Sequence, residues 1–312
     1  MRWRVLITTP QLQQTIDRYR IQFAQKGIEI ELPALVQQLK EPDLLEIIDR
    51  FDGIIAGDDE MTTRVLEKAK RLKVISRWGV GVDAIDLEAA RRLGIQVYNT
   101  PDVFADEVAD VVIGYLVLLV RQLHRLDQAV REGNWTKIQG HSLQGKKLGV
   151  IGLGSIGRAV VRRGVALSMP VVGTDIVPVP NSFVAETDVR LVPLEELLQC
   201  ADFISLNCNL TPSNRHMIGF RELARMKKGV YLINTARGAL IDEAALVHAL
   251  QEGKVSGVAL DVFEQEPLPE DSSLRRFENC IFGTHNSSNT LEAVLRVNEM
   301  AIRNLMEGLG AE

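Results

Sequence analysis

The stretch Gly152-Leu153-Gly154-Ser155-Ile156-Gly157 decides the fold. It follows an apolar run that predicts a buried strand, and it precedes a stretch whose small and apolar residues predict a helix. In a dinucleotide site the first glycine allows a tight turn, the second lets the backbone approach the pyrophosphate, and the third lets the helix pack on the strand. The N–H groups and positive dipole end of the helix hold the phosphates. The sequence therefore predicts a dinucleotide site, with candidate binding residues Gly152, Gly154, Ser155, Ile156 and Gly157.

A second apolar run ends on Asp175, at about the distance beyond the glycines where a dinucleotide site carries an acid. A carboxylate there accepts hydrogen bonds from the adenosine ribose hydroxyls and repels a 2′-phosphate, which usually needs an arginine nearby. The residues that follow, Ile176, Val177 and Pro178, supply no cation. The alternative is an aspartate that only caps a turn. We favour the binding role, because ligands meet open parallel sheets at the carboxyl ends of strands, and so we expect NAD rather than NADP.

Length and composition exclude several classes of protein. A chain of 312 residues exceeds the usual limit for one domain, so two domains are expected. The net charge of −5, without a long basic run, argues against nucleic acid and anionic membranes as partners. The longest apolar segment, residues 111–120, is too short to cross a bilayer. The cysteines, Cys200, Cys208 and Cys280, lack metal-ligand spacing, so we expect no metal, and free thiols in the cytoplasm.

Two series of apolar runs alternate with helical stretches. The first predicts strands at 5–8, 28–31, 53–56, 74–76 and 96–99 and helices at 44–49, 63–71 and 87–93. The second predicts strands at 147–151, 171–174, 203–207, 230–234, 257–260 and 281–282. A long helix is expected between them at 105–132, and another at 290–309. Such alternation is typical of α/β proteins with parallel sheets covered on both faces.

Strand ends beyond the glycine turn carry the groups that could reduce a 2-keto acid. Arg237 follows one predicted strand, and a guanidinium is a permanent cation that binds a carboxylate with two hydrogen bonds. His285 ends another apolar run, a place that none of the other four histidines has, so it is the candidate general acid and base. A carboxylate from the intervening segment would favour its imidazolium form. Glu264 and Glu266 are both open for that role.

These segments resemble the D-isomer-specific 2-hydroxyacid dehydrogenases, and the resemblance covers nearly the whole chain. The motifs that carry it are Asn234-Thr235-Ala236-Arg237-Gly238, Asp261 to Pro267, Thr284-His285, Arg77-Trp78-Gly79-Val80-Gly81-Val82-Asp83, Asn99-Thr100-Pro101, Val108-Ala109-Asp110, Gly133-Asn134-Trp135 and Gly145-Lys146-Lys147-Leu148. The resemblance implies that Arg237 binds the substrate carboxylate and carbonyl, that His285 donates the proton and that Glu266 is its partner. It also implies that Asp261 lies by the nicotinamide carboxamide and that Ala236 contacts the cofactor.

The resemblance further implies an architecture of two doubly wound parallel-sheet domains. A Rossmann-type NAD domain, expected at residues 101–285, is inserted into a flavodoxin-like substrate domain, expected at residues 1–100 and 286–312. Members of the family are usually dimers joined through the cofactor domain. Such an interface would explain the apolar helix at Val111–Val120, and core packing would explain it equally well.

The substrate is harder to predict, because the sequence departs from the family pattern at several places. The resemblance implies that the backbone of Val80 and Gly81 meets the substrate carboxylate. Arg77 matches an arginine that meets the substrate phosphate in phosphoglycerate dehydrogenases of the family, which makes such an activity the alternative. The acidic loop Asp58–Glu60 would repel a phosphate if it pointed inward, and would be neutral to it if it faced solvent.

We therefore expect an NAD-dependent dehydrogenase of a small unphosphorylated 2-hydroxy acid, close to glyoxylate or hydroxypyruvate reductases. The alternative hypothesis from another functional class is a non-enzymatic protein that senses NAD. It is disfavoured because Arg237, Glu266 and His285 are all retained.

Overall fold

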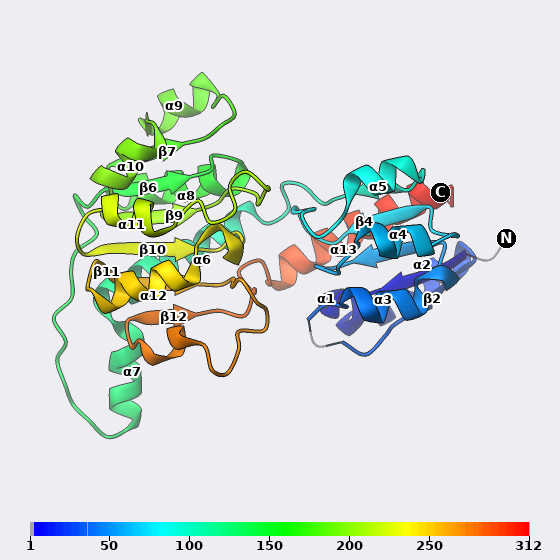
Figure 1. Ribbon diagram of the computed structural model, residues 1–312, viewed down its shortest axis with the longest axis horizontal. Helices are drawn as coiled ribbons and strands as arrows, with labels where there is room; N and C mark the ends of the chain where they lie inside the picture. The colour runs from blue at the N-terminus through cyan, green and yellow to red at the C-terminus, as the bar shows by residue number, and fades with distance from the viewer. Residues whose placement is uncertain (1–2, 36, 312) are drawn as a thin grey trace. The chain divides into compact units, whose positions relative to one another are not determined.

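The computed structural model describes residues 3–35 and 37–311. The chain forms two compact units (Figure 1), one made of Met1–Val103 and Asn289–Glu312 and the other of Phe104–Ser288. Both junctions lie a few residues beyond the expected ones. Arg296 donates to the carbonyl of Val103 at 3.0 Å, which ties that residue to the first unit. The backbone amide of Ser287 donates to Asp261 at 2.8 Å, which keeps the segment after His285 with the second unit.

The first unit contains a five-stranded parallel sheet of order β2-β1-β3-β4-β5, which is the flavodoxin-like order. Its strands are β1 (Trp3–Ile7), β2 (Ile28–Glu31), β3 (Gly53–Ala56), β4 (Val74–Arg77) and β5 (Gln96–Tyr98). Its helices are α1 (Pro10–Gln14), α2 (Arg20–Gln25), α3 (Glu41–Ile47), α4 (Thr63–Lys68), α5 (Leu87–Arg92) and, from the end of the chain, α13 (Leu291–Leu309).

Helix α13 returns to complete this unit, and its small residues let it lie close to the sheet. A Cβ on Gly308 would come within 2.4 Å of Val74 on β4. Asn298, fully buried on α13, accepts a hydrogen bond of 2.7 Å from the indole of Trp78 and donates to Thr15. The segment that follows β4 is therefore held in place by a helix that lies more than 200 residues later in the chain.

The second unit contains a seven-stranded parallel sheet of order β12-β11-β10-β9-β6-β7-β8. Its strands are β6 (Leu148–Ile151), β7 (Val171–Thr174), β8 (Arg190–Leu191), β9 (Phe203–Leu206), β10 (Val230–Asn234), β11 (Val255–Leu260) and β12 (Cys280–Phe282). Its helices are α6 (Ala105–Arg121), α7 (Leu123–Arg131), α8 (Ser155–Ala166), α9 (Asn181–Thr187), α10 (Leu194–Cys200), α11 (Phe220–Arg225) and α12 (Glu243–Gln251). The chain order reverses beside β6, as in a Rossmann-type sheet, and the predicted class of two doubly wound parallel sheets is confirmed.

Neighbouring residues along the strands of this sheet enter two different hydrophobic clusters. Ile204 and Leu232 belong to one cluster, whereas Phe203 and Ile233 belong to the other. Both faces of the sheet are therefore buried, because side chains alternate between the faces of a strand. This explains why the strands appear in the sequence as unbroken apolar runs.

The predicted continuous helix over 105–132 is wrong at one residue. Gln122 adopts a left-handed conformation with φ of 49° and separates α6 from α7. The carbonyl of Val120 accepts instead from the amide of His141 at 2.9 Å, and a Cβ on Gly140 would lie only 2.5 Å from that carbonyl. The returning chain thus replaces a helical hydrogen bond, which periodicity within the helix cannot reveal.

The two helices differ in burial. Val112, Leu116 and Leu119 of α6 lie in the core, so core packing accounts for much of that apolar helix. Helix α7 has no buried residue, and Trp135, shortly after it, is 86% exposed.

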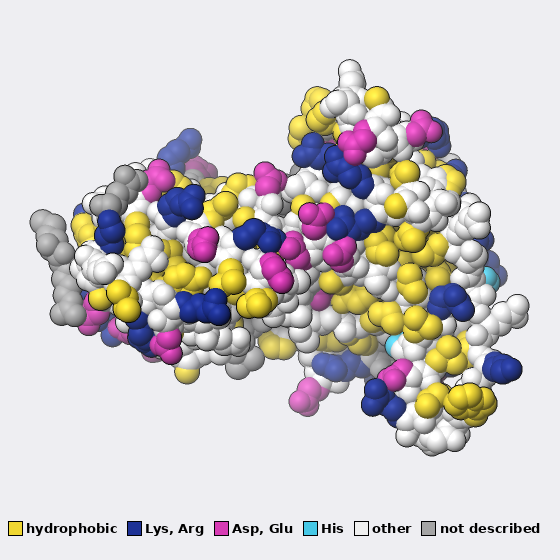
Figure 2. All heavy atoms as spheres, turned by 180° about the vertical axis from the view of Figure 1, so that it is seen from behind, with side chains coloured by type: hydrophobic (Ala, Val, Ile, Leu, Met, Phe, Trp, Pro, Cys, Tyr) yellow, Lys and Arg dark blue, Asp and Glu magenta, His cyan; other side chains and the backbone are white. Residues whose placement is uncertain are grey.

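Acidic and basic side chains are interspersed on the face shown in Figure 2, in keeping with the small net charge. None of the helices described is long and apolar enough to cross a membrane.

Candidate active site

The glycine turn has the backbone that a pyrophosphate site requires. Gly152 has φ of 88°, and a Cβ there would meet the backbone of Cys208 at 2.7 Å. Gly157 lies so close to the preceding turn that a Cβ would be 1.9 Å from the carbonyl oxygen of Gly152. No described atom lies within 4 Å of a Cβ built on Gly154, where α8 begins. The two outer glycines are thus needed for packing, and the middle one leaves open space where phosphates approach a helix N-terminus.

Asp175 lies directly after β7 and fixes the shape of this turn. One carboxylate oxygen accepts from the amide of Leu153 at 2.5 Å, and the other accepts from the amide of Val177 at 2.9 Å. The side chain belongs to an open pocket of about 490 Å³ that is lined by residues 173–179 and 191–193. Each carboxylate oxygen has a further lone pair, so Asp175 can still accept from a ribose hydroxyl. This pocket suits the adenosine end of a dinucleotide, and the open space at Gly154 suits its phosphates.

Buried Asn234, the last residue of β10, organises the loop that carries Arg237. Its side chain donates to the carbonyl of Arg237 at 2.8 Å and accepts from the amide of Ala236 at 3.0 Å. Arg237 itself donates to the carbonyl of Ala236 at 2.8 Å. The hydroxyl of Thr235 is buried and finds no partner within residues 3–35 and 37–311. The sequence does not mark Thr235 as a binding residue, because its only signal there is its place after a strand.

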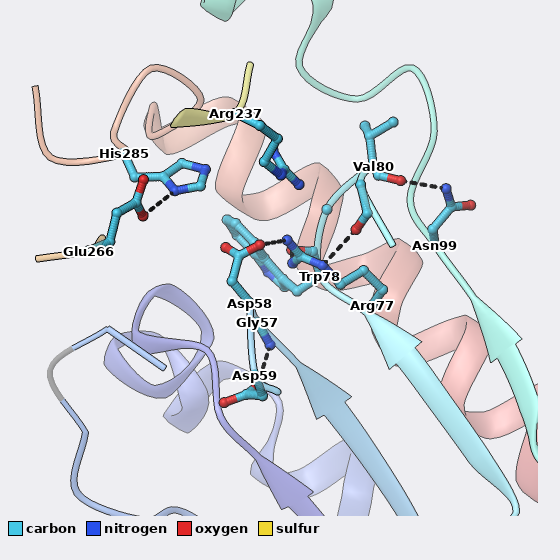
Figure 3. Close-up of polar contacts among 12 residues, drawn as sticks. Gly57, Asp58, Asp59, Arg77, Trp78, Val80, Asn99, Arg237, Glu266 and His285 are labelled. Atoms are coloured by element: carbon cyan, nitrogen blue, oxygen red, sulfur yellow. Dashed lines mark hydrogen bonds and ion pairs between the residues drawn. The ribbon is translucent and has the colours of Figure 1, made fainter. Parts of the chain in front are cut away.

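Gly238 brings this loop against the segment that follows β11. A Cβ at residue 238 would lie 1.8 Å from the backbone of Phe263, so no other residue fits there without moving the segment. In that segment the carboxylate of Glu266 accepts from the amide of Phe263 at 3.0 Å and from Nδ1 of His285 at 2.8 Å (Figure 3). The side chains of His285 and Glu266 are 24% and 16% exposed, so their hydrogen bond is partly shielded from water.

The structure distinguishes the two glutamates that the sequence left open. Glu264 accepts from Nε2 of His216 at 2.9 Å, and it exchanges two hydrogen bonds with Glu243 at the start of α12. Burial raises the pKa of Glu243, and the nearby charge of Glu264 adds to this shift. Glu264 therefore anchors the segment at one end, while Glu266 contacts His285.

Asp261, at the end of β11, is buried and accepts from the amide of Asn286 at 3.1 Å and from the amide and hydroxyl of Ser287. Its backbone carbonyl accepts from the amide of His285 at 2.7 Å. A Cβ on Gly283 would lie 2.0 Å from its carboxylate. Asp261 thus fixes the turn on which His285 stands, where the histidine has φ of 54°.

In the first unit, the turn after β4 is held through its carbonyl groups. The carbonyl of Gly79 accepts from the amide of Thr100 at 3.0 Å, and the carbonyl of Val80 accepts from Asn99 at 2.8 Å. Arg77 donates through Nε to the carbonyl of Gly81 at 2.9 Å and through Nη1 to that of Trp78. Arg77 also pairs through Nη2 with Asp58 at 2.5 Å, as Figure 3 shows.

The three acids of the loop Asp58–Glu60 have three different environments. Asp58 pairs with Arg77, and Glu60 pairs with Lys40 at 3.0 Å. Asp59 is fully buried and accepts from Thr8 and from the amides of Leu39 and Gly57. Burial raises the pKa of Asp59 to about 6, against the lowering effect of these hydrogen bonds. The loop is therefore neither wholly inward nor wholly in solvent.

A Rossmann-type sheet with this glycine turn, this acid after its second strand and a histidine–carboxylate pair at its strand ends defines an NAD-dependent oxidoreductase. Residues 113–287 match the family model described as D-isomer specific 2-hydroxyacid dehydrogenase, NAD binding domain. The chain belongs to this family. The expectations from the sequence on family, oxidoreductase class and cofactor are confirmed.

Relatives with several substrates are similar to this chain. It is 40% identical to D-3-phosphoglycerate dehydrogenase of Methanocaldococcus jannaschii over 93% of its length, but it spans only 54% of that protein. It is 35% identical to hydroxypyruvate reductase of Thermotoga maritima over 99% of both chains. The structure of D-lactate dehydrogenase from Aquifex aeolicus complexed with NAD and lactic acid superposes with a TM-score of 0.85, at 30% identity, over 96% of this chain and 93% of that one.

Proposed function

We propose that the protein catalyses reversible hydride transfer between NAD(H) and a small unphosphorylated 2-keto or 2-hydroxy acid, such as glyoxylate or hydroxypyruvate. The observation that carries this proposal is the hydrogen bond between Glu266 and Nδ1 of His285. A protein that only senses NAD has no use for a shielded acid–base pair at a strand end. A general acid that must stay protonated near neutral pH does need such a carboxylate.

The roles of the side chains follow from their chemistry. The bound cofactor supplies the hydride. Arg237 binds the substrate carboxylate and carbonyl, and its charge stabilises the negative charge that develops on the carbonyl oxygen. Because Nδ1 of His285 is bonded to Glu266, we assign proton transfer to Nε2. In reduction the imidazolium donates to the carbonyl oxygen, and in oxidation the neutral imidazole removes the hydroxyl proton.

The turn after β4 is suited to contact the substrate carboxylate. In a trans peptide the N–H of one residue points opposite to the carbonyl of the residue before it. The carbonyls of Gly79 and Val80 are bonded to Thr100 and Asn99, so the amides of Val80 and Gly81 point away from those partners. Neither amide has an acceptor within the described residues. Successive amides of this kind form an anion-binding concavity.

The protein is also proposed to be a cytoplasmic homodimer. Helix α7 carries Leu123 and Val130, which are 40% and 54% exposed, and Trp135 beyond it is more exposed still. Apolar side chains gathered on one segment commonly mark a protein interface. Light scattering after gel filtration tests the dimer, and Trp135→Ala is expected to weaken it. The three cysteines are free, as suits a reducing compartment.

A steady-state assay of NADH oxidation with a panel of 2-keto acids tests the proposed activity. The panel contains glyoxylate, hydroxypyruvate, pyruvate and phosphohydroxypyruvate. Turnover of the small keto acids supports the proposal, and a strong preference for phosphohydroxypyruvate would favour a phosphoglycerate dehydrogenase. Binding of NADH without turnover of any compound would favour the sensor.

A further inference from the structure

Arg77 has its charge and its hydrogen-bonding nitrogens engaged within its own unit. Its side chain is 6% exposed. Nε and Nη1 donate to the carbonyls of Gly81 and Trp78, and Nη2 donates to the carboxylate of Asp58. A guanidinium buried to this extent needs a counter-charge, and Asp58 provides it.

The backbone around Arg77 is built to keep it in this position. Gly79 has φ of 143°, and a Cβ on it would lie 2.8 Å from Nη1 of Arg77. The guanidinium therefore lies directly against the turn whose carbonyls it holds. To reach a ligand it would have to release two backbone carbonyls and an ion pair, and leave polar groups of the turn without partners.

Asp58 is the acid of its loop that forms an ion pair with Arg77. The carboxylate of Asp59 is used by Thr8, Leu39 and Gly57, and Glu60 pairs with Lys40. Asp58 lies beside Arg77, its side chain 27% exposed. An anionic group approaching Arg77 would meet this carboxylate next to the cation.

We infer that Asp58 is a specificity-determining residue, which pairs with Arg77 and thereby selects against substrates that carry a phosphate at the end remote from the carboxylate. This inference rests on the proposed function. An arginine commonly binds a phosphate through two parallel hydrogen bonds from its guanidinium. Here Arg77 supports the turn as a positioning residue, and its charge is already balanced. Substrates with a neutral remote end, such as a hydrogen or a hydroxymethyl group, avoid the repulsion.

The test uses Asp58→Asn, which removes the charge and keeps the size of the side chain. The measured quantity is kcat/KM for phosphohydroxypyruvate divided by kcat/KM for hydroxypyruvate. We expect the substitution to raise this ratio at least about tenfold, mainly through a lower KM for the phosphorylated compound, since uniform binding appears in KM. NADH binding and the melting temperature show that the variant is folded.

The matched control is Glu60→Gln, which removes one charge from the same loop without touching Arg77. It is expected to leave the ratio unchanged. An equal rise in both variants would show a general effect of loop charge and overturn the inference, as would an unchanged ratio in Asp58→Asn.

Absence of the proposed hydride-transfer activity would look different, because wild type would then turn over none of the keto acids. Calorimetric titration with glycerate and 3-phosphoglycerate in the presence of NAD would still show whether Asp58 selects against a phosphorylated ligand. Tighter binding of 3-phosphoglycerate by Asp58→Asn than by wild type supports the inference, and equal binding overturns it.

Discussion

Substitution of Glu266 by glutamine separates charge from shape in the pair with His285. The glutamate accepts two hydrogen bonds, from the amide of Phe263 and from Nδ1 of His285. A glutamine has only one acceptor oxygen, so its amide nitrogen must face one of these donors. The variant loses the negative charge beside the histidine and one of the two contacts.

The size of the effect can be worked out from the geometry. The Nδ1–Oε2 distance is 2.8 Å, and both side chains are less than a third exposed. A hydrogen bond to a charged group in such a setting contributes about 1.5–3 kcal/mol. Since about 1.4 kcal/mol corresponds to one unit of pH, the basic limb of the reduction profile should move acidward by roughly one to two units. Oxidation uses the neutral imidazole, so the rate of oxidation at low pH should fall less in Glu266→Gln than in wild type.

The assay is kcat/KM for keto acid reduction across the pH range, with wild type and Glu266→Gln side by side. Glu264→Gln is the matched control, because Glu264 bonds to His216 rather than to His285. Its profile should keep the wild-type basic limb. An unshifted limb in Glu266→Gln, or an equal shift in the control, would refute the reasoning.

Three further substitutions test the other assignments. His285→Ala should lower kcat for reduction by about 10²–10⁴-fold while NADH still binds, and a wild-type rate would contradict the assignment. Asp175→Ala should narrow the preference for NADH over NADPH in kcat/KM, because the repulsion of a 2′-phosphate is lost; an unchanged ratio would count against the role of Asp175. Burial raises the pKa of Asp59 from 3.8 to about 6, so protonation stabilises the fold fully below about pH 4, and this stability is lost as the pH rises through 6. Between about pH 4 and about pH 7, the free energy of unfolding in urea should therefore fall by up to roughly 3 kcal/mol more in wild type than in Asp59→Asn. Parallel curves of unfolding free energy against pH for the two proteins would contradict the shift in the pKa of Asp59.

Much of the fold could be predicted because its signals are local. Central strands such as β3, β6 and β9 are buried along their whole length, and a buried run is visible in the sequence without any tertiary contact. The break at Gln122 could not be predicted, because it depends on the contact between Val120 and His141. The edge strand β8 was missed for a different reason: it has two residues, and both are exposed.

The residues of the candidate site also fall into those that local sequence signals predict and those that depend on tertiary contacts. His285 and Arg237 stand at strand ends, where the order of elements alone draws attention to them. The choice between Glu264 and Glu266 depends on where the segment after β11 is anchored, and that anchor is the start of α12. No spacing rule within the segment contains this information, so the residues alone left the choice open.

The acidic loop shows why counting charges is a poor guide to substrate choice. Each acid of Asp58–Glu60 adds the same charge in the sequence, yet each acts through a different neighbour. Asp59 is an internal acceptor that joins the loop to Thr8 and Leu39, so its hydrogen bonds stabilise the fold. Glu60 is balanced by Lys40 at the surface, where an exposed pair has little energetic effect. Asp58 alone of the three pairs with Arg77 beside the turn proposed to bind substrate, so it is the acid whose removal should change which substrates are accepted.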